Sequence, residues 1–201
     1  MAISLVKGQK ISLEKSDGQQ LTNICVGVNW GAIMERNFLG RSKAVAVDLD
    51  ASAITFDVNS NVLDVVYFGK LSAQGIQHSG DDLVGDVGGD DGLDNEIIDV
   101  RLNQLPSNVD KIAFVLNSFN RQDFKNIPFA SIPVFEGSMT HIDKVHAQFD
   151  IANDPKFAGS VSMVLAKMYK HNGNWKLAAI GEVTRDQSLE NTVATVQNAY
   201  I

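Results

Sequence analysis

The residues best suited to chemistry are acids gathered in one short stretch. Between positions 81 and 96 the chain carries seven carboxylates and no Lys or Arg. The whole protein has 24 acids and 17 bases, a formal net charge of −7. The acids outside the stretch match the bases in number, so the excess negative charge lies entirely within it. Acids this dense are tolerated when they are solvated or when they hold a cation.

Other residues of the stretch favour the cation. Glycines at short intervals allow backbone turns with positive φ, and they are Gly80, Gly85, Gly88, Gly89 and Gly92. Apolar residues, which a solvated acidic segment does not need, are interleaved at Leu83, Val84, Val87 and Leu93. Ca²⁺ takes roughly 6–8 oxygen ligands, whereas zinc prefers thiolate and imidazole ligands. We therefore expect calcium, with a solvated acidic loop as the alternative. The site is not an EF-hand, because Asp90-Asp91-Gly92 breaks the required alternation.

A second pair of acids lies at the end of a predicted strand, residues 44–50. Side chains alternate across a strand, so Val45, Val47 and Leu49 face one way. Asp48 and Asp50 then share the opposite face. Two like charges placed together are costly unless a cation or hydrogen-bond donors lie between them.

Short apolar segments of period two dominate the rest of the chain and predict β-strands. The expected strands are 10–13, 24–30, 44–50, 54–58, 62–68, 97–102, 111–118, 131–135, 145–151, 160–170 and 175–183. Residues 34–43 are expected to form a loop, and residues 119–127 a short helix or an irregular crossover. Asn172-Gly173 predicts a type I′ hairpin turn.

The C-terminal residues change to helical spacing. Leu189, Val193, Val196 and Tyr200 form one stripe, and Ser188 is the expected N-cap. Many short strands and one terminal helix predict a mainly β protein, a β-sandwich of two sheets with a C-terminal α-helix. The 201 residues are expected to form a single domain, 1–201.

Composition narrows the classes of function. No apolar run approaches a membrane span, the first residues do not form a signal sequence, and Cys25 is the only cysteine. We expect Cys25 to be buried in a strand, and the protein to be cytoplasmic without inserting into a membrane. The negative net charge and the lack of a basic cluster argue against nucleic-acid binding.

Enzymatic activity has little support. The four histidines form no recognisable pairing with a nucleophile, and His78, which borders the acidic stretch, is expected at the surface. We therefore expect a non-enzymatic protein with no catalytic residues. The alternative is a metal-dependent hydrolase that uses the same carboxylates to activate water.

Several motifs together resemble the TerD family of tellurium-resistance and bacterial stress proteins. They are Asp48-Leu49-Asp50-Ala51-Ser52, His78-Ser79-Gly80-Asp81-Asp82, Gly85-Asp86, Gly89-Asp90-Asp91, the opening 3–13, Leu105-Pro106-Ser107-Asn108-Val109-Asp110-Lys111-Ile112 and His171-Asn172-Gly173-Asn174-Trp175. The likeness covers essentially the whole chain. Gly88 and Gly92 depart from it, standing where the family often has Asp and Glu, and residues 93–96 form a short extension.

The resemblance implies a β-sandwich that binds calcium, with two ions expected. It also implies a bacterial protein of a system that confers resistance to tellurite, some phages and pore-forming colicins. Its partners would be other Ter-family or membrane-associated proteins of that system, which would place it at most peripherally on the inner membrane. Self-association through the C-terminal helix or an open sheet edge stays open.

The motifs and the acidic stretch together indicate eleven metal-site residues. Asp94 and Glu96 are included because they could replace the acids missing at Gly88 and Gly92, and two glycines mark backbone turns. The set is Asp48, Asp50, Asp81, Asp82, Gly85, Asp86, Gly89, Asp90, Asp91, Asp94 and Glu96.

Overall fold

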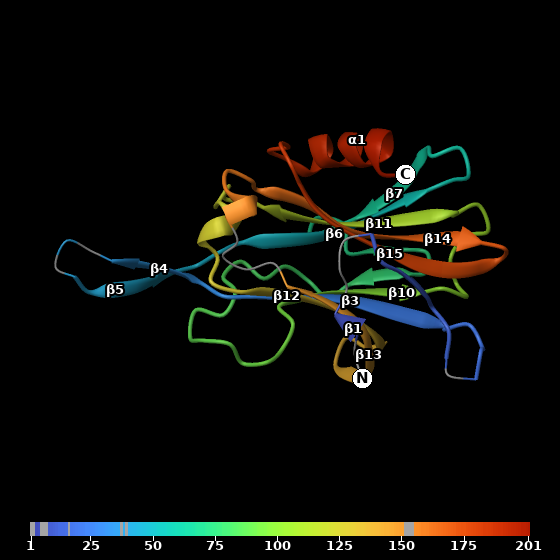
Figure 1. Ribbon diagram of the computed structural model, residues 1–201, viewed down its shortest axis with the longest axis horizontal. Coiled ribbons are helices and arrows are strands. Elements are labelled where there is room, and N and C mark those ends of the chain that lie inside the picture. Colours follow the sequence, from blue (N-terminus) through green and yellow to red (C-terminus); the bar gives the residue numbers. More distant parts are fainter. Residues whose placement is uncertain (1–2, 5–7, 16, 37, 39, 151–154) are drawn as a thin grey trace.

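Strands with alternating apolar residues stack face to face as two sheets (Figure 1). The computed structural model describes residues 3–4, 8–15, 17–36, 38, 40–150 and 155–201. One sheet contains, in spatial order, β1 (Ile3–Ser4), β13 (His141–Asp150), β12 (Ala130–Ser138), β3 (Asn23–Trp30), β10 (Glu96–Arg101), β9 (Ile76–His78) and β8 (Ser72–Ala73). The other contains β2 (Lys10–Ser12), β15 (Asn174–Thr184), β14 (Ser162–His171), β11 (Lys111–Ser118), β6 (Leu49–Phe56) and β7 (Val62–Val66). The predicted β-sandwich is confirmed.

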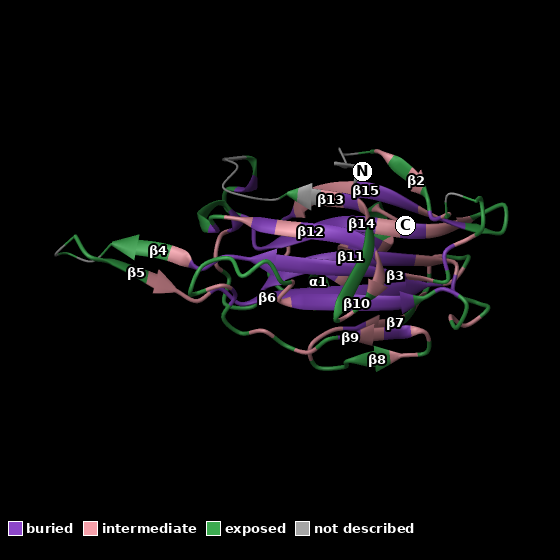
Figure 2. Ribbon diagram, turned by 90° about the horizontal axis from the view of Figure 1, so that it is seen from below, coloured by how far each residue is buried: buried purple, intermediate pink, exposed green. Residues whose placement is uncertain are grey.

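The main core fills the space between the two sheets. Ile24, Val26, Val28 and Trp30 all point into it, as the period of two in β3 predicts. The central strands are buried along most of their length (Figure 2). Cys25 points to the opposite side of β3 and is fully buried there with Ile97 and Phe135, so the prediction of a buried strand cysteine is confirmed.

The helix α1 (Leu189–Ala199) covers the outer face of the six-stranded sheet (Figure 1). Ser188 is its N-cap, and the Ser188 Oγ accepts the N–H of Asn191 at 3.4 Å. Val196 is buried against the sheet, and Leu189 and Val193 pack beside it. The predicted N-cap and apolar stripe are both confirmed. No helix in the described part of the chain is long and apolar enough to cross a membrane.

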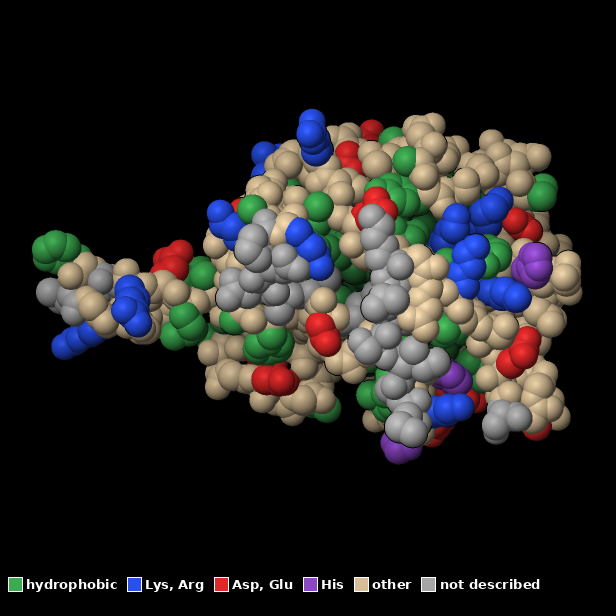
Figure 3. All heavy atoms as spheres, viewed as in Figure 1, with side chains coloured by type: hydrophobic (Ala, Val, Ile, Leu, Met, Phe, Trp, Pro, Cys, Tyr) green, Lys and Arg blue, Asp and Glu red, His purple; other side chains and the backbone are tan. Residues whose placement is uncertain are grey.

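The segment 34–43, expected to be a loop, contains instead parts of two paired strands, β4 (Ile33–Arg36) and β5 (Ser42–Val45), which form a hairpin. The hairpin projects from the body and carries exposed basic and hydrophobic side chains (Figure 3). Because most of its side chains are exposed, it holds together through backbone pairing and has no apolar alternation to reveal it in the sequence.

The strand predicted over 44–50 is interrupted between Val45 and Leu49. There the side chain of Gln122 takes the place of a neighbouring strand. Its Nε2 donates to the Ala46 carbonyl at 2.7 Å, and its Oε1 accepts the Asp48 N–H at 3.3 Å. The local sequence pattern cannot reveal that the side chain of Gln122, so far along the chain, would pair with this backbone in place of a strand.

Two local predictions in other segments are confirmed. Asn172 and Gly173 have φ values of 52° and 81°, as a type I′ turn requires. The segment after β11 contains a short 3₁₀ helix, η1 (Phe124–Asn126), capped by Asp123. A second 3₁₀ helix, η2, spans Pro155–Phe157. Ile151, predicted to end a strand, lies outside the described residues.

Candidate metal centre

Three carboxylates meet where β6 begins, and we call them the strand-end cluster: Asp48, Asp50 and Asp81. One oxygen from each lies within 4.8 Å of the others. Asp48 and Asp50 are each 5% exposed, and Asp81 reaches them from the acidic loop. The structure thus brings together the strand-end pair and the first loop aspartate, as the motifs predict.

Asp48 is only partly satisfied by the protein. Its Oδ2 accepts a hydrogen bond from Asn120 Nδ2 at 3.3 Å. Its Oδ1 is buried and has no hydrogen-bond partner among the described residues. A buried, unpaired carboxylate oxygen is expensive unless a donor or a cation reaches it. This atom therefore marks a position that suits a cation.

The electrostatic setting of the strand-end cluster disfavours two negative charges. Burial, followed by the nearby Asp81, Glu96 and Asp82, raises the pKa of Asp48 to about 6. Burial, followed by Glu96 and Asp48, raises the pKa of Asp50 to about 7. A bound cation would reverse this preference by compensating the charges.

A second group of carboxylates lies within the acidic loop, and we call it the loop cluster: Asp86, Asp90 and Asp91. One oxygen from each again lies within 4.8 Å of the others. All three carboxylates stay near the surface, in contrast to Asp48 and Asp50. The described residues thus contain two three-carboxylate groups, which is compatible with two ions.

Asparagines brace the loop cluster. Asn29 Nδ2 donates to Asp90 Oδ1 at 3.1 Å, and Asn95 Nδ2 donates to Asp86 Oδ1 at 3.3 Å. Asn29 is 8% exposed, and its Oδ1 has no partner among the described residues. Sequence reasoning missed both residues. The alternation of β3 does place Asn29 opposite the apolar face, and this was the available signal.

The acidic loop is attached to β3 by backbone contacts. The N–H of Asp86 donates to the Trp30 carbonyl and that of Asn95 to the Val28 carbonyl, each at 2.9 Å. Gly85 has φ +61° and lies directly against the indole of Trp30, so a side chain there would collide with the ring. Gly89 also has positive φ, at +103°. Both glycines occupy turns, as predicted.

The apolar side chains of the loop do not anchor it. All four are exposed, by 45–68%, and they are Leu83, Val84, Val87 and Leu93. Hydrogen bonds to β3 and within the loop hold its shape instead.

Three of the predicted ligands lie outside both clusters. Asp82 accepts the N–H groups of Val84 and Gly85, each at 2.9 Å, and so shapes the turn. Asp94 lies against Gly27 of β3, where burial raises its pKa to about 6. Glu96 is the first residue of β10 and is fully buried.

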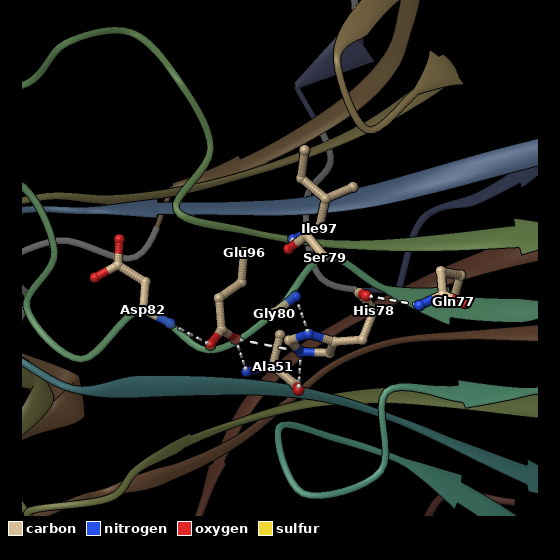
Figure 4. A network of polar contacts seen from close by, with 8 residues as sticks. All are labelled: Ala51, Gln77, His78, Ser79, Gly80, Asp82, Glu96 and Ile97. Atoms are coloured by element: carbon tan, nitrogen blue, oxygen red, sulfur yellow. Dashed lines mark hydrogen bonds and ion pairs between the residues drawn. The ribbon is translucent and has the colours of Figure 1, made fainter.

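The Glu96 carboxylate is surrounded by donors (Figure 4). Oε2 accepts the Ala51 N–H at 2.7 Å, and Oε1 accepts the Asp82 N–H at 3.3 Å. His78 Nε2 lies 3.5 Å from Oε2 and 3.1 Å from the Ala51 carbonyl. Because His78 Nδ1 accepts the Gly80 N–H at 3.1 Å, the ring carries a proton on Nε2, which donates to the Ala51 carbonyl and lies near Glu96. Because its oxygens accept these hydrogen bonds from the protein, Glu96 has a structural role next to the strand-end cluster and is not part of it.

The expectation of a surface histidine at position 78 is wrong, because His78 is only 2% exposed. Its neighbours in sequence are polar and suggest solvent. Its partners, Glu96 and Ala51, come from other strands and bury it.

Comparison with known proteins agrees with this architecture. A family model described as TerD domain matches residues 1–195. The chain belongs to the TerD family. Tellurium resistance protein TerZ of Serratia marcescens is 30% identical over 203 residues, covering 99% of this chain and 99% of its own. Stress response protein SCP2 of Bacillus subtilis (strain 168) is 35% identical over 208 residues, covering 96% and 98%.

Solved structures show the same TerD fold. A homologue of telluride resistance protein (TerD) from Streptomyces coelicolor A3(2) superposes with a TM-score of 0.64 and 16% identity, covering 86% of this chain and 95% of that chain. A likeness at this level of identity bears on the fold alone.

Proposed function

We propose that this protein is a calcium-binding, non-enzymatic module of a bacterial stress response that contributes to tellurite resistance, and to phage and colicin resistance. The observation that carries the calcium proposal is Asp48 Oδ1, a buried oxygen without a partner among the described residues, in a cluster with Asp50 and Asp81. The stress-response part is supported by the names of relatives, tellurium resistance protein TerZ and stress response protein SCP2.

Calcium fits the chemistry of both clusters. Their side chains offer carboxylate oxygens, with the carbonyl oxygen of Asn29 beside the loop cluster. Hard cations prefer such oxygen ligands, and Ca²⁺ tolerates irregular geometry better than Mg²⁺. Two Ca²⁺ ions would neutralise four of the six carboxylate charges in the two clusters.

Calcium would act here by ordering a surface. The acidic loop is held to β3 at a few points and otherwise carries dense like charges. Neutralising them would favour one loop conformation, which partner proteins of the same resistance system could then recognise. The hydrolase alternative gains no support from the names of the relatives, which are those of resistance and stress proteins.

The test is thermal unfolding of metal-stripped protein titrated with Ca²⁺, with Mg²⁺ and high salt as controls. At about 100 times Kd, one site adds about 2.7 kcal/mol, which for this size raises Tm by about 5–10 °C. We expect the rise with Ca²⁺ and a much smaller one with the controls. An equal response to all three would indicate charge screening and refute a specific site.

Matched variants assign the site. Asp48→Asn should lose the part of the calcium response that comes from the strand-end cluster, about half if each cluster holds one ion, because it replaces a charged oxygen there. Asp143→Asn, an exposed aspartate of β13 outside both clusters, should keep the full response. Undiminished calcium affinity in Asp48→Asn would remove Asp48 from the ligand set.

A further inference from the structure

A cavity of about 230 Å³ lies beside the strand-end cluster, at the first turn of α1. Asp50 lines it from β6, Asn117 from β11 and Leu189 from α1, while Phe68 and Phe119 contribute aromatic side chains. Asp50 therefore belongs to both the cluster and the cavity. The cluster uses one oxygen of each residue, so Asp50 keeps a second carboxylate oxygen.

Polar residues form a row across the sheet at the inner end of the cavity. Asp50, Asn117, Ser162 and Thr184 are direct partners across β6, β11, β14 and β15. Directly opposite residues share a face, here the outer face that α1 covers. All four are buried, by 91% or more. Apolar residues such as Ile54, Val115 and Val164 cover much of the remaining face, which also holds the buried Ser52.

The hydrogen bonds of the row fix the orientation of the Asn117 amide. Ser162 Oγ donates to the Asp186 carbonyl at 2.9 Å, and Thr192 Oγ1 donates to the Ser188 carbonyl at 3.0 Å. Each hydroxyl has a single hydrogen, so both must accept from Asn117 Nδ2, at 2.7 and 3.0 Å. The other amide atom, Oδ1, is buried without a partner among the described residues.

Asp50 and Asn117 are therefore paired residues that both line the cavity and both carry an acceptor oxygen. Opposite residues in an antiparallel pair have Cβ atoms about 4.5–5.5 Å apart. A group with several N–H donors can reach both, and a positive charge on that group suits the carboxylate. The rings of Phe68 and Phe119, 5.6 Å apart in an edge-to-face pair, offer apolar contact and attract cations.

We propose that this cavity binds a small organic molecule that carries an ammonium group on an apolar body. The ammonium group donates to Asp50 and Asn117 Oδ1, and the body packs against Phe119 and Leu189. Such molecules are simple amines or amino acids. Arg121, an exposed residue that also lines the cavity, would hold the carboxylate of an amino acid. The cavity does not need calcium to bind this molecule, but because Asp50 belongs to both sites, calcium at the strand-end cluster should weaken ammonium binding.

The test is calorimetric titration of metal-free protein with phenethylamine and phenylalanine. Phenethyl alcohol and phenylacetate are matched probes without the ammonium group. We expect Kd values of roughly 0.1–1 mM for the ammonium probes and binding at least about tenfold weaker for the other two. Tighter binding of phenylalanine than of phenethylamine would identify an amino acid, and the reverse order an amine. Calcium binding, measured separately on the same sample, leaves the two proposals distinguishable.

Variants locate the binding site. Phe119→Ala changes a residue that is 60% exposed, so the fold should survive, and affinity should fall about fivefold. Asn117→Leu should lower affinity about tenfold, and in the unsubstituted protein the ammonium probes should shift the side-chain amide signals of Asn117 in NMR spectra. Phe38→Ala, an exposed residue of the β4–β5 hairpin, is the control without effect. The proposal is overturned if neither ammonium probe binds at about 10 mM, if the alcohol binds equally well, or if Phe119→Ala binds as wild type.

Discussion

Asp48 and Asp50 occupy surroundings that favour their protonated forms. Burial and neighbouring carboxylates raise their pKa values to about 6 and about 7 from an ordinary 3.8. A raised carboxyl pKa means that ionisation costs folding free energy. The metal-free protein therefore loses stability from these groups as pH rises from about 4 through 6 and 7. A cation selects the ionised forms, so its binding must displace protons over the same range.

The pH dependence of calcium affinity follows from these two residues. We expect affinity to fall as pH is lowered from about 8 to about 5, with the steepest change near the raised pKa values. Calcium binding near pH 6 should release protons. Calorimetry in two buffers with different ionisation enthalpies measures both quantities. A constant affinity with no proton release would contradict the involvement of Asp48 and Asp50.

At the scale of elements, the acidic loop depends on a close fit to β3. Its glycines are not equivalent. Gly85 combines a positive φ with direct contact to the Trp30 indole, whose Nε1 donates to the Val47 carbonyl at 2.7 Å. Gly88 has no neighbouring atoms within 4 Å of an added Cβ, and its φ is not positive.

Alanine substitutions should separate the two glycines. Gly85→Ala should lower the free energy of unfolding by about 1–3 kcal/mol, because the backbone is strained and the methyl group displaces Trp30. It should also weaken calcium binding by shifting the loop. Gly88→Ala is the matched control, with a change within about 0.5 kcal/mol. Urea denaturation with a chelator present measures both, and equal effects would refute this account of the loop.

At the scale of the molecule, Glu96 links the two sheets. It lies on β10 of the seven-stranded sheet and accepts the N–H of Ala51 on β6 of the other. His78, on β9, completes the contact by approaching both residues. Ala51 is the residue after Asp50 in β6, so the position of the strand-end cluster depends on how the sheets are joined.

Glu96→Gln tests this link. The substitution keeps the shape but replaces one acceptor with an NH₂ donor, so at least one buried N–H loses its partner. We expect the free energy of unfolding to fall by about 1–3 kcal/mol. Glu35→Gln, at an exposed position of β4, should change it by less than about 0.5 kcal/mol. Similar values for the two variants in urea denaturation would show that Glu96 does not join the sheets.

The sequence by itself determined features that depend on near neighbours along the chain. Alternation in β3 placed its core side chains, Asn172-Gly173 specified its turn, and Ser188 began the helix. The glycines at 85 and 89 and the pairing of Asp48 with Asp50 also followed from local spacing. Steric limits on the backbone and the two-residue period of a strand act over a few residues, so a sequence pattern reports them.

Only the tertiary structure decided which polar groups meet. The sequence predicts Glu96 to be a metal ligand and His78 to lie at the surface. The packing of the strands instead buries the two side chains against each other. Asn29 gained its role from Asp90, 61 residues away along the chain. The bonds from Asn117 Nδ2 to Ser162 and Thr192 fix the amide, and its Oδ1 has no partner in the described part of the chain. The physical reason is that burial and hydrogen-bond satisfaction are properties of the assembled neighbourhood, to which residues far apart along the chain contribute.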